Sequence, residues 1–413
     1  MKWLKRFIWA FWACLIVTIA LCVCLDWSKG KIDNQDAKQV EIKQSVISGY
    51  DGQLRRFWIK AQTVWTAKSP YIFYAEDVSN GILFDESGKR VVDGISAKKV
   101  KVNSKTHTIS AENGVMATLY GVNDRQGPIV ISCDQLRYYD LNGRAYMQGN
   151  IVLKQGKMEI RPQGKVEFDR FTNVVTIEDG LVCYFPPFTL NATMMTLFLN
   201  ENKAVVSGNI QGVRQPEVAK DADERQALLL SVPTSFSCRQ LVYAASGNRQ
   251  LVDLYTDVVI SQKKRFLSGQ HGQYNQQNGD FTMMGKAVFK SDSLTFLVDN
   301  KRKKAISHPD VVKGIGQPTT VTCESFQFNT RTKTLVLDGN IIVTQPQLAL
   351  KSNHIVYSDG DGTLELSGYV DIKKGQKLTE SVKTSQLTYN LYKENMKMKG
   401  NIDTIIELKK KSL

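Results

Sequence analysis

The stretch that decides the fold is Ile131-Ser-Cys-Asp-Gln-Leu-Arg-Tyr138, in which apolar residues alternate with others on both sides of the small residue Cys133. Such a period of two residues is typical of a β-strand with one buried face. The alternation changes phase between Cys133 and Leu136, which indicates a β-bulge or a corner. After a short turn a second apolar run follows, Gly149-Asn-Ile-Val-Leu153. Together the two runs predict a pair of strands with a shared apolar inner face.

This pattern recurs through most of the chain at spacings of roughly thirty residues, which indicates a repeat architecture. Its first apolar residue falls at Ile59, Ile95, Ile131, Ile160, Leu190, Phe236, Leu267, Phe289, Val321, Leu350 and Val382. The small position holds, in the same order, Ala61, Ala97, Cys133, Pro162, Ala192, Cys238, Gly269, Ser291, Cys323, Ser352 and Thr384. The last apolar position is clearest at Tyr138, Tyr243, Tyr274, Phe296, Phe328, Tyr357 and Tyr389, whereas the copy at Ile160 carries an extra residue and reaches Phe168.

Each repeat therefore predicts two strands that meet at a corner, and stacked repeats predict one long apolar groove between their inner faces. A glycine before the second run, as in Gly149-Asn and Gly339-Asn, would permit the bend. The fold class expected is all-β, built from stacked V-shaped strand pairs. The candidate groove residues are Ile59, Ile95, Ile131, Leu136, Tyr138, Ile151, Leu153, Phe236, Leu241, Tyr243, Val321, Phe326, Phe328 and Ile341.

The length of 413 residues exceeds that of one ordinary compact core, so we expect more than one domain. Residues 28–44 are polar and predict a linker, and residues 45–212 and 235–413 predict two stacks of strands. Residues 213–234 break the repeat and predict an insertion, of which Glu217 to Leu230 could form a short helix between two prolines.

Residues 1–27 predict a cytoplasmic tip and a membrane anchor. Lys2, Lys5 and Arg6 precede an uncharged, mostly apolar run from Phe7 to Leu25. That run is nearly long enough to span a hydrocarbon layer of ~30 Å, and basic residues on its short side favour the cytoplasm for that side. A cleaved signal peptide is the alternative, but no small-x-small cleavage site follows the run. The chain is thus expected to be a single-pass protein with its bulk outside the cytoplasm.

The sequence offers little for catalysis or metal binding. Cys133, Cys238 and Cys323 occupy the small position of the repeat, which predicts buried thiols, and no CxxC or Cys/His spacing suggests zinc. The segment Asp359-Gly-Asp-Gly362 is typical of a hairpin turn more than of a calcium loop. No known catalytic motif is present, and the histidines are scattered at His107, His271, His308 and His354. We therefore expect a protein that is not an enzyme and has no cofactor.

The net charge of +14 favours an anionic partner. Basic residues cluster at Arg55-Arg56, Lys98-Lys99, Lys263-Lys-Arg265, Lys301-Arg-Lys-Lys304 and Lys409-Lys-Lys411, several of them in expected turns. Cations at the rim of an apolar groove would suit an amphiphile with phosphates on its head and acyl chains in its tail. Simple solvation of the turns is the other interpretation. Nucleic acid is disfavoured because the aromatic residues follow the core positions of the repeat.

The anchor, followed by Gly52-Gln-Leu-Arg-Arg-Phe-Trp-Ile-Lys-Ala61, Ile95-Ser-Ala97 and the stretch quoted first, resembles the periplasmic lipopolysaccharide-transport proteins of the LptC type and the wider OstA-like (LptA-like) domain. The resemblance covers about residues 1–182, and residues 183–413 continue the repeat. It implies an open β-jellyroll that holds lipopolysaccharide acyl chains, in a protein of the cell inner membrane. It also implies edge-strand docking to the inner-membrane ABC transporter and to another OstA-like protein.

Two alternatives share the repeats. One is a right-handed β-helix, either a polysaccharide-cleaving enzyme or a surface adhesin, although its coils are usually shorter and exposed paired carboxylates are not evident. The other is a structural scaffold that binds proteins through its sheet edges. Lipid bound inside the groove would separate the transport protein from both.

Overall fold

A computed structural model of the chain describes residues 38–66, 69–85, 87–120, 127–216, 231–246, 249–275, 277–298, 306, 309–375 and 380–405. Strands make up most of these residues, so the all-β class predicted from the repeat is confirmed. The chain divides into two compact units. Unit 1 contains residues 1–156 and 165–173, and unit 2 contains residues 157–164 and 174–413.

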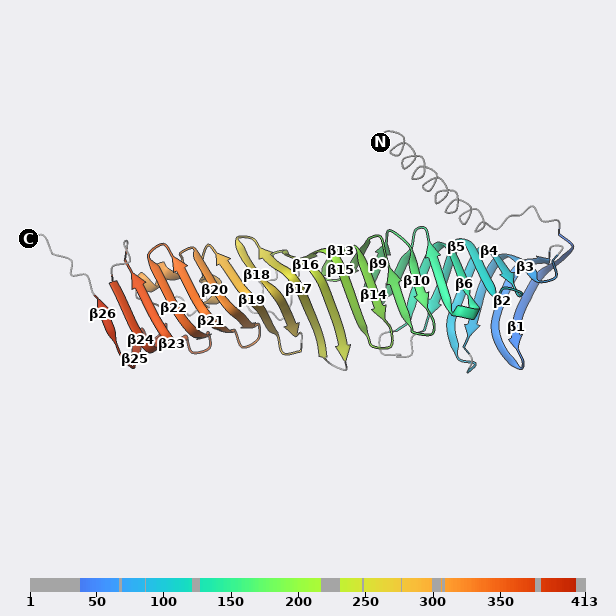
Figure 1. The fold of residues 1–413 in the computed structure, drawn as a ribbon. Helices are drawn as coiled ribbons and strands as arrows, with labels where there is room; N and C mark the ends of the chain where they lie inside the picture. The colour runs from blue at the N-terminus through green and yellow to red at the C-terminus, as the bar shows by residue number, and fades with distance from the viewer. Residues whose placement is uncertain are drawn as a thin grey trace, which may run out of the picture. The chain divides into compact units, whose positions relative to one another are not determined.

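Unit 1 is a run of long antiparallel strands that follow one another in sequence (Figure 1). Its strands are β1 (Val40–Asp51), β2 (Leu54–Thr66), β3 (Ile72–Phe84), β4 (Arg90–Asn103), β5 (Thr108–Leu119), β6 (Ile129–Tyr139), β7 (Arg144–Gln148), β8 (Val152–Gln155) and β10 (Val166–Asp169), with the 3₁₀ helix η2 (Asp140–Asn142). Strand β6 pairs with β7 and β8 in turn, and β7 also pairs with β10.

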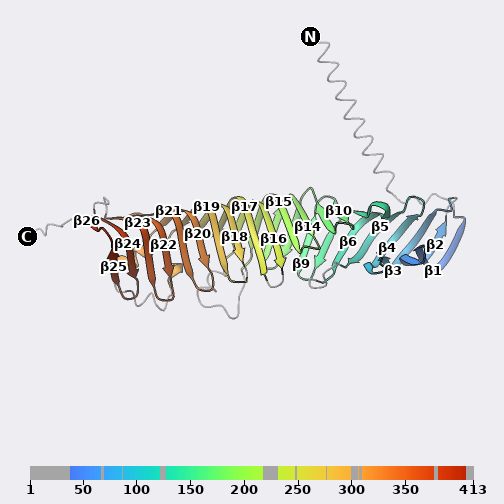
Figure 2. The same cartoon turned by 60° about the horizontal axis from the view of Figure 1, so that its bottom comes forward.

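Unit 2 begins with short strands and continues as a regular ladder, which Figures 1 and 2 show from two sides. The short strands are β9 (Met158–Pro162), β11 (Val174–Ile177), β12 (Leu181–Phe185), β13 (Phe188–Ala192) and β14 (Met194–Phe198). The ladder contains β15 (Lys203–Arg214), β16 (Thr234–Ser246), β17 (Arg249–Gln262), β18 (Arg265–Asn275), β19 (Asp280–Ser291), β20 (Thr319–Asn329), β21 (Thr334–Gln345), β22 (Leu348–Ser358), β23 (Thr363–Lys374), β24 (Glu380–Asn390), β25 (Asn395–Lys399) and β26 (Asp403–Ile405), together with η3 (Thr295–Leu297) and α4 (Pro309–Ile315).

The register of neighbouring strands shifts at the predicted point of each repeat. In unit 1 the shift between β5 and β6 lies between Glu112 and Val115, opposite Cys133. In unit 2 the same shift recurs, for example between Asp338 and Ile341 of β21. The bulge predicted from the phase change is therefore confirmed. All the pairings among the described strands are antiparallel, whereas a β-helix stacks parallel strands, so the fold is not that of the β-helix alternative.

In several pairs the corner is made by two consecutive residues in left-handed backbone conformation. Gly339 and Asn340 have φ values of 76° and 46°, and Gly149 and Asn150 have values of 73° and 43°. A larger residue does not fit at Gly149, because a Cβ there would collide with the side chain of Asp134. The asparagine Nδ2 then donates to the acid of the preceding strand, from Asn150 to Asp134 at 2.9 Å.

Two sequence predictions differ from the structure. Strand β1 begins at Val40, inside the expected linker of residues 28–44, because Val40 and Ile42 already pair with β2. The copy expected at Phe289 is wrong: β19 ends at Ser291, and Phe296 lies in η3. Strand β19 is the second strand of its pair, since Gly285 and Lys286 form its left-handed corner with φ values of 79° and 57°.

The predicted anchor from Phe7 to Leu25 lies outside the described residues, as do residues 217–230 of the predicted insertion. Within the part of the chain that is described, no helix has the length and apolar character that crossing a membrane requires. On either side of the predicted insertion β15 and β16 pair directly along their length. The division between the compact units lies earlier in the chain, at residues 156–174.

Candidate functional site

The inner face of unit 1 encloses an apolar cavity. Its empty volume is about 630 Å³, which includes space open to solvent. Strands β3 to β7, β10 and the residues that flank them supply its walls. The lining residues are Leu83, Phe84, Val91, Val92, Ile95, Val115, Ala117, Leu119, Ile131, Leu136, Tyr138, Ala145, Met147, Phe168 and Arg170.

Pairs of large and small residues on adjacent strands explain why this space exists. Ile131 of β6 lies opposite Ala117 of β5, and Tyr138 lies opposite Ala145 of β7. Side chains of directly opposed residues stand on the same face of a sheet and contact each other. A small partner therefore leaves volume beside each large side chain. The alternation that predicts the strands thus also places these residues along the cavity wall.

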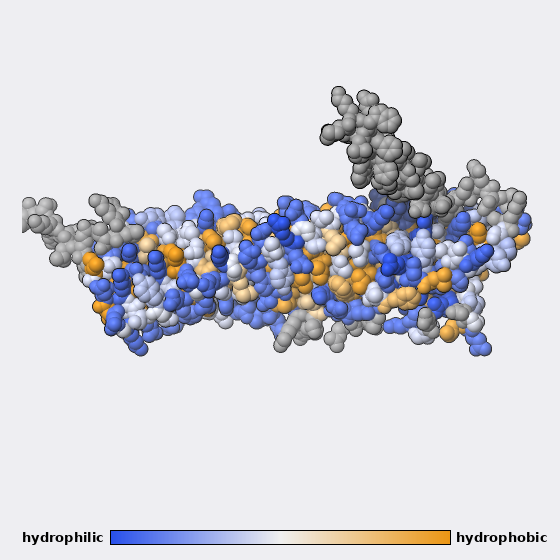
Figure 3. All heavy atoms as spheres, viewed as in Figure 1, coloured by the Kyte–Doolittle hydropathy of each residue, from blue (hydrophilic) through white to orange (hydrophobic). Residues whose placement is uncertain are grey.

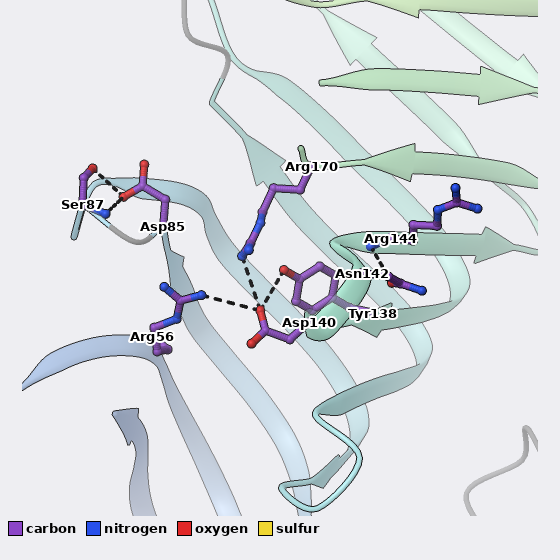
Figure 4. A network of polar contacts seen from close by, with 8 residues as sticks. All are labelled: Arg56, Asp85, Ser87, Tyr138, Asp140, Asn142, Arg144 and Arg170. Atoms are coloured by element: carbon purple, nitrogen blue, oxygen red, sulfur yellow. Dashed lines mark hydrogen bonds and ion pairs between the residues drawn. The ribbon is translucent and has the colours of Figure 1, made fainter. Parts of the chain in front are cut away.

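A charged cluster lies at the end of the cavity where Arg170 contributes to the wall (Figure 4). Asp140 Oδ1 accepts hydrogen bonds from the Tyr138 hydroxyl at 3.1 Å and from Arg170 Nη1 at 3.3 Å. Arg56 of β2 reaches the same oxygen with Nη2 at 3.9 Å. The side chains of Arg56 and Arg170 retain 16% and 14% of their accessible surface, so both guanidinium groups are largely removed from water.

The electrostatics of the cluster keep Tyr138 protonated. Burial raises the pKa of the Tyr138 hydroxyl far above its usual range, Arg170 opposes the shift, and Asp140 adds to it. The phenol therefore remains a hydrogen-bond donor to Asp140 at neutral pH. Arg170 is also held by the faces of two rings, at 6.0 Å from the centroid of Tyr138 and 5.1 Å from that of Phe171.

The structure brings four of the predicted groove residues of unit 1 together. Ile95, Ile131, Leu136 and Tyr138 all line the cavity. The other three candidates of this unit are buried but do not line it: Ile59, Ile151 and Leu153. Four of the seven candidates of this unit therefore line the cavity, and lipid binding by any of them stays a prediction.

The candidates of unit 2 lie on β16, β20 and β21. Leu241, Val321 and Ile341 are buried. Four aromatic residues are half-buried: Phe236, Tyr243, Phe326 and Phe328. No described contact assigns a ligand to them, so their role in lipid binding stays a prediction.

Part of the inner face of unit 2 is covered by the chain itself. The described residues between β19 and β20 (292–298, 306 and 309–318), called the inserted segment below, include η3 and α4. The Phe296 ring lies 6.0 Å from that of Phe289, which in turn stacks on Phe326 at 5.7 Å. On β22 the Tyr357 hydroxyl donates to the carbonyl of Leu297 at 3.4 Å. These contacts place Phe296 and Leu297 of the inserted segment against β19 and β22.

The charged cluster beside the cavity was not predicted from the sequence. Arg170 and Asp140 lie in turns, outside the repeating strand positions, and Arg56 was grouped with exposed Arg55 as a rim cation. The local signal that existed was the copy at Ile160, whose last apolar residue is displaced to Phe168. That displacement places Phe168 in the cavity wall and Arg170 two residues later at its end.

The thiols behave as the repeat predicts. Cys133, Cys183, Cys238 and Cys323 are buried and unbridged. Burial raises the pKa of the Cys133, Cys183 and Cys323 thiols to about 12 and that of Cys238 to about 11, with smaller influences from neighbouring groups. Among the described residues, His, Cys, Asp and Glu side chains form no group that could hold a metal ion.

No family model matches the chain, and no curated protein matches it.

Proposed function

We propose that the protein binds the acyl chains of lipopolysaccharide, or of a related glycolipid, as a periplasmic component of lipopolysaccharide export of the LptC type. In this proposal unit 1 is an open β-jellyroll, and its cavity accepts acyl chains. The chain would be held in the inner membrane by residues 7–25, receive glycolipid from the ABC transporter and pass it toward the outer membrane.

The observation that carries this proposal is the chemistry of the cavity. Its walls are apolar side chains apart from Arg170 at one end. An apolar tail gains free energy from burial in such a space, at ~25 cal/mol per Å² of apolar surface removed from water. The charged end provides donors for an acidic head. A site of this kind binds and releases an amphiphile without bond chemistry, so the proposed role is not enzymatic and requires no cofactor.

The sheet edge of unit 1 supports docking to other proteins. In the described part of the chain, β1 pairs with β2 alone. Its side chains Val40, Ile42 and Val46 are more than half exposed, at 55%, 56% and 53%. A long apolar edge strand offers unpaired backbone groups to a strand of a partner. We propose that β1 is where the transporter or another OstA-like protein pairs with this chain. The same observation supports the second candidate, an edge-binding scaffold that carries no lipid.

Site-specific photo-crosslinking in cells tests the proposal. A crosslinker at Leu136, which lines the cavity, is expected to capture lipopolysaccharide. The adjacent Arg137 is the matched control, because its side chain points to the other face of β6 and bonds to the Tyr139 hydroxyl. Equal capture at both positions would overturn the cavity as the site of binding.

Mass spectrometry of lipid that co-purifies with the detergent-extracted protein separates the two candidate functions. We expect acylated glycolipid at a constant ratio to protein and a loss of surface lipopolysaccharide when the protein is depleted. A lipid-free protein whose loss leaves surface lipopolysaccharide unchanged would favour the scaffold.

A further inference from the structure

Arg170 is placed unusually for an arginine of a β protein, because it forms part of the wall of an apolar cavity while only 14% of its side chain remains exposed. A guanidinium group carries five N–H donors. Among the described residues, a single acceptor, Asp140 Oδ1, receives a hydrogen bond from the Arg170 guanidinium group. The ring contacts with Tyr138 and Phe171 fix the group without satisfying its remaining donors.

In the described cluster around Arg170, positive charges outnumber negative ones. Arg56 and Arg170 both face Asp140, so among the described groups of this cluster two cations share one carboxylate. Asp85 appears in the same view, but its Oδ1 accepts from Ser87 and Lys89 of its own turn (Figure 4). Burying a charge without full pairing is costly, so the cluster gains free energy from a further anion.

The geometry around Asp140 permits its carboxylate to be replaced by the anionic group of a ligand. Asp140 lies in the short helix η2 and keeps 34% of its side-chain surface, about twice that of either arginine. Its carboxylate can therefore turn toward water while the arginines stay in place. A phosphate or carboxylate accepts two parallel hydrogen bonds from one guanidinium group, which a single Asp140 oxygen does not.

We propose that Arg170 and Arg56 form a headgroup site that binds the phosphate or carboxylate of an acidic amphiphile whose chain fills the cavity, with Asp140 as the internal counterion that the headgroup displaces. This inference rests on the proposed function and adds what the site recognises: the anionic group, phosphate or carboxylate, of the amphiphile whose chain lies in the cavity. Tyr138 would remain a neutral donor to whichever anion is present.

Binding of an alkyl series to the purified full-length protein in detergent tests the site. The probes are an alkyl phosphate, an alkyl carboxylate and an alkyl alcohol of one chain length, together with inorganic phosphate. We expect both acidic amphiphiles to bind about tenfold more tightly than the alcohol, equivalent to ~1.4 kcal/mol. Inorganic phosphate, which lacks the chain, should bind at least about a hundredfold more weakly than the alkyl phosphate.

The outcomes are distinguishable. Equal affinity for alcohol and acids would overturn the headgroup site and leave the apolar cavity standing. Binding of inorganic phosphate as tightly as alkyl phosphate would show an anion site independent of any amphiphile and also overturn the inference. Absence of binding by every alkyl probe would overturn the inference that an alkyl chain fills the cavity beside this site, whereas the proposed function fails only if no glycolipid co-purifies with the protein.

Variants assign the effect to residues. Arg170→Gln should remove the preference for acids and leave affinity for the alcohol within about twofold. Arg144→Gln is the matched control: Arg144 points away from the cluster and pairs with Glu167 at 3.1 Å (Figure 4). An equal loss for all three alkyl probes in Arg170→Gln would assign Arg170 a packing role and overturn the site.

Asp140→Asn provides a second test that does not depend on removing an arginine. Without the internal carboxylate, the acidic amphiphiles should bind about tenfold more tightly than they bind the unaltered protein, while the alcohol should be unaffected. Weaker binding of the acids by Asp140→Asn, in a protein that still binds the alcohol, would contradict displacement of Asp140.

Discussion

The two units use one strand repeat but leave their inner faces in different states. In unit 1 large residues lie opposite small ones, such as Tyr138 opposite Ala145, and a cavity remains. In unit 2 the face between β18 and β22 is packed against the inserted segment, with Arg265 over the ring of Phe296 at 4.3 Å. The repeat therefore determines the walls, and residues outside the repeat determine whether the space between the walls is occupied.

This difference is chemical as well as spatial. In unit 2 the ring of Phe296, which belongs to the chain itself, covers apolar surface of the kind that binds a ligand. The arginine near this surface has different partners in the two units. Arg265 of unit 2 lies over the ring of Phe296, whereas Arg170 of unit 1 faces both the cavity and Asp140. The covered face contributes to the stability of unit 2, and the uncovered one is available for binding.

The largest expected effect comes from removing the ring that packs on unit 2. Phe296→Ala should lower the free energy of unfolding by about 3 kcal/mol, at the lower end of the ~3–5 kcal/mol typical of buried Phe→Ala changes, because Phe296 is half-buried. Chemical denaturation followed by intrinsic fluorescence measures it. Ile342→Ala is the control, since Ile342 is 42% exposed on β21 and should cost within about 0.5 kcal/mol. Equal losses would contradict a packed face.

Enlarging one alanine in each unit tests the comparison directly. Ala287→Leu in β19, where the alanine is 1% exposed, should destabilise the protein by about 1–3 kcal/mol through overpacking. Ala145→Leu in β7 should cost less than about 1 kcal/mol, because its added methyl groups enter the cavity. The same change should reduce lipid capture at Leu136. A larger loss for Ala145→Leu than for Ala287→Leu would show that the cavity is not free space.

The smallest effect concerns the buried cysteine at the small position of the repeat, which is Cys133 in unit 1 and Cys323 in unit 2. Burial and the charge of Asp134 raise the pKa of Cys133 from 9.0 to about 12, so the folded state holds the thiol proton that the unfolded state loses above about pH 9. Its contribution to stability is complete below about pH 9 and is lost as pH rises toward about 12. Cys133→Ala should change stability little at pH 7 and reduce the loss at alkaline pH in thermal unfolding.

Cys323→Ala in unit 2 should behave in the same way, because burial and Asp338 raise the pKa of Cys323 to about 12. Neither thiol should react with an alkylating reagent at pH 8 in the folded protein. Rapid alkylation of Cys133 alone would mean that the cavity admits the reagent to the corner of β6.

Periodicity predicted the elements that repeat and failed where the chain departs from it. The phase change beside Cys133 identified the bulge because one extra residue necessarily shifts the alternation. At Phe289 the same pattern was misleading: Phe289, Ser291 and Phe296 match the motif, but the strand ends at Ser291 and the chain enters the inserted segment. The short spacing after Leu267 and the corner at Gly285 were the available warnings.

The candidate site was predictable only in its apolar part. Ile95, Ile131, Leu136 and Tyr138 follow from strand alternation, which fixes the face on which a side chain lies. Arg170, Asp140 and Arg56 are brought together by the packing of three separate segments, and no local pattern encodes that meeting. Charged residues in turns usually remain in solvent, so their burial becomes evident only from the structure.

The strand ladder of unit 2 also has a consequence for how the protein unfolds. Each long strand from β16 onward pairs mainly with its neighbours in sequence. Stability in such an array is approximately a sum of nearest-neighbour terms, and most of the loops that must close to form it are short, apart from residues 292–318 between β19 and β20. A mutation that weakens the interface between two neighbouring strands would therefore allow the segments on either side of it to unfold separately. Unfolding would begin by fraying at β26, whose described side chains are exposed.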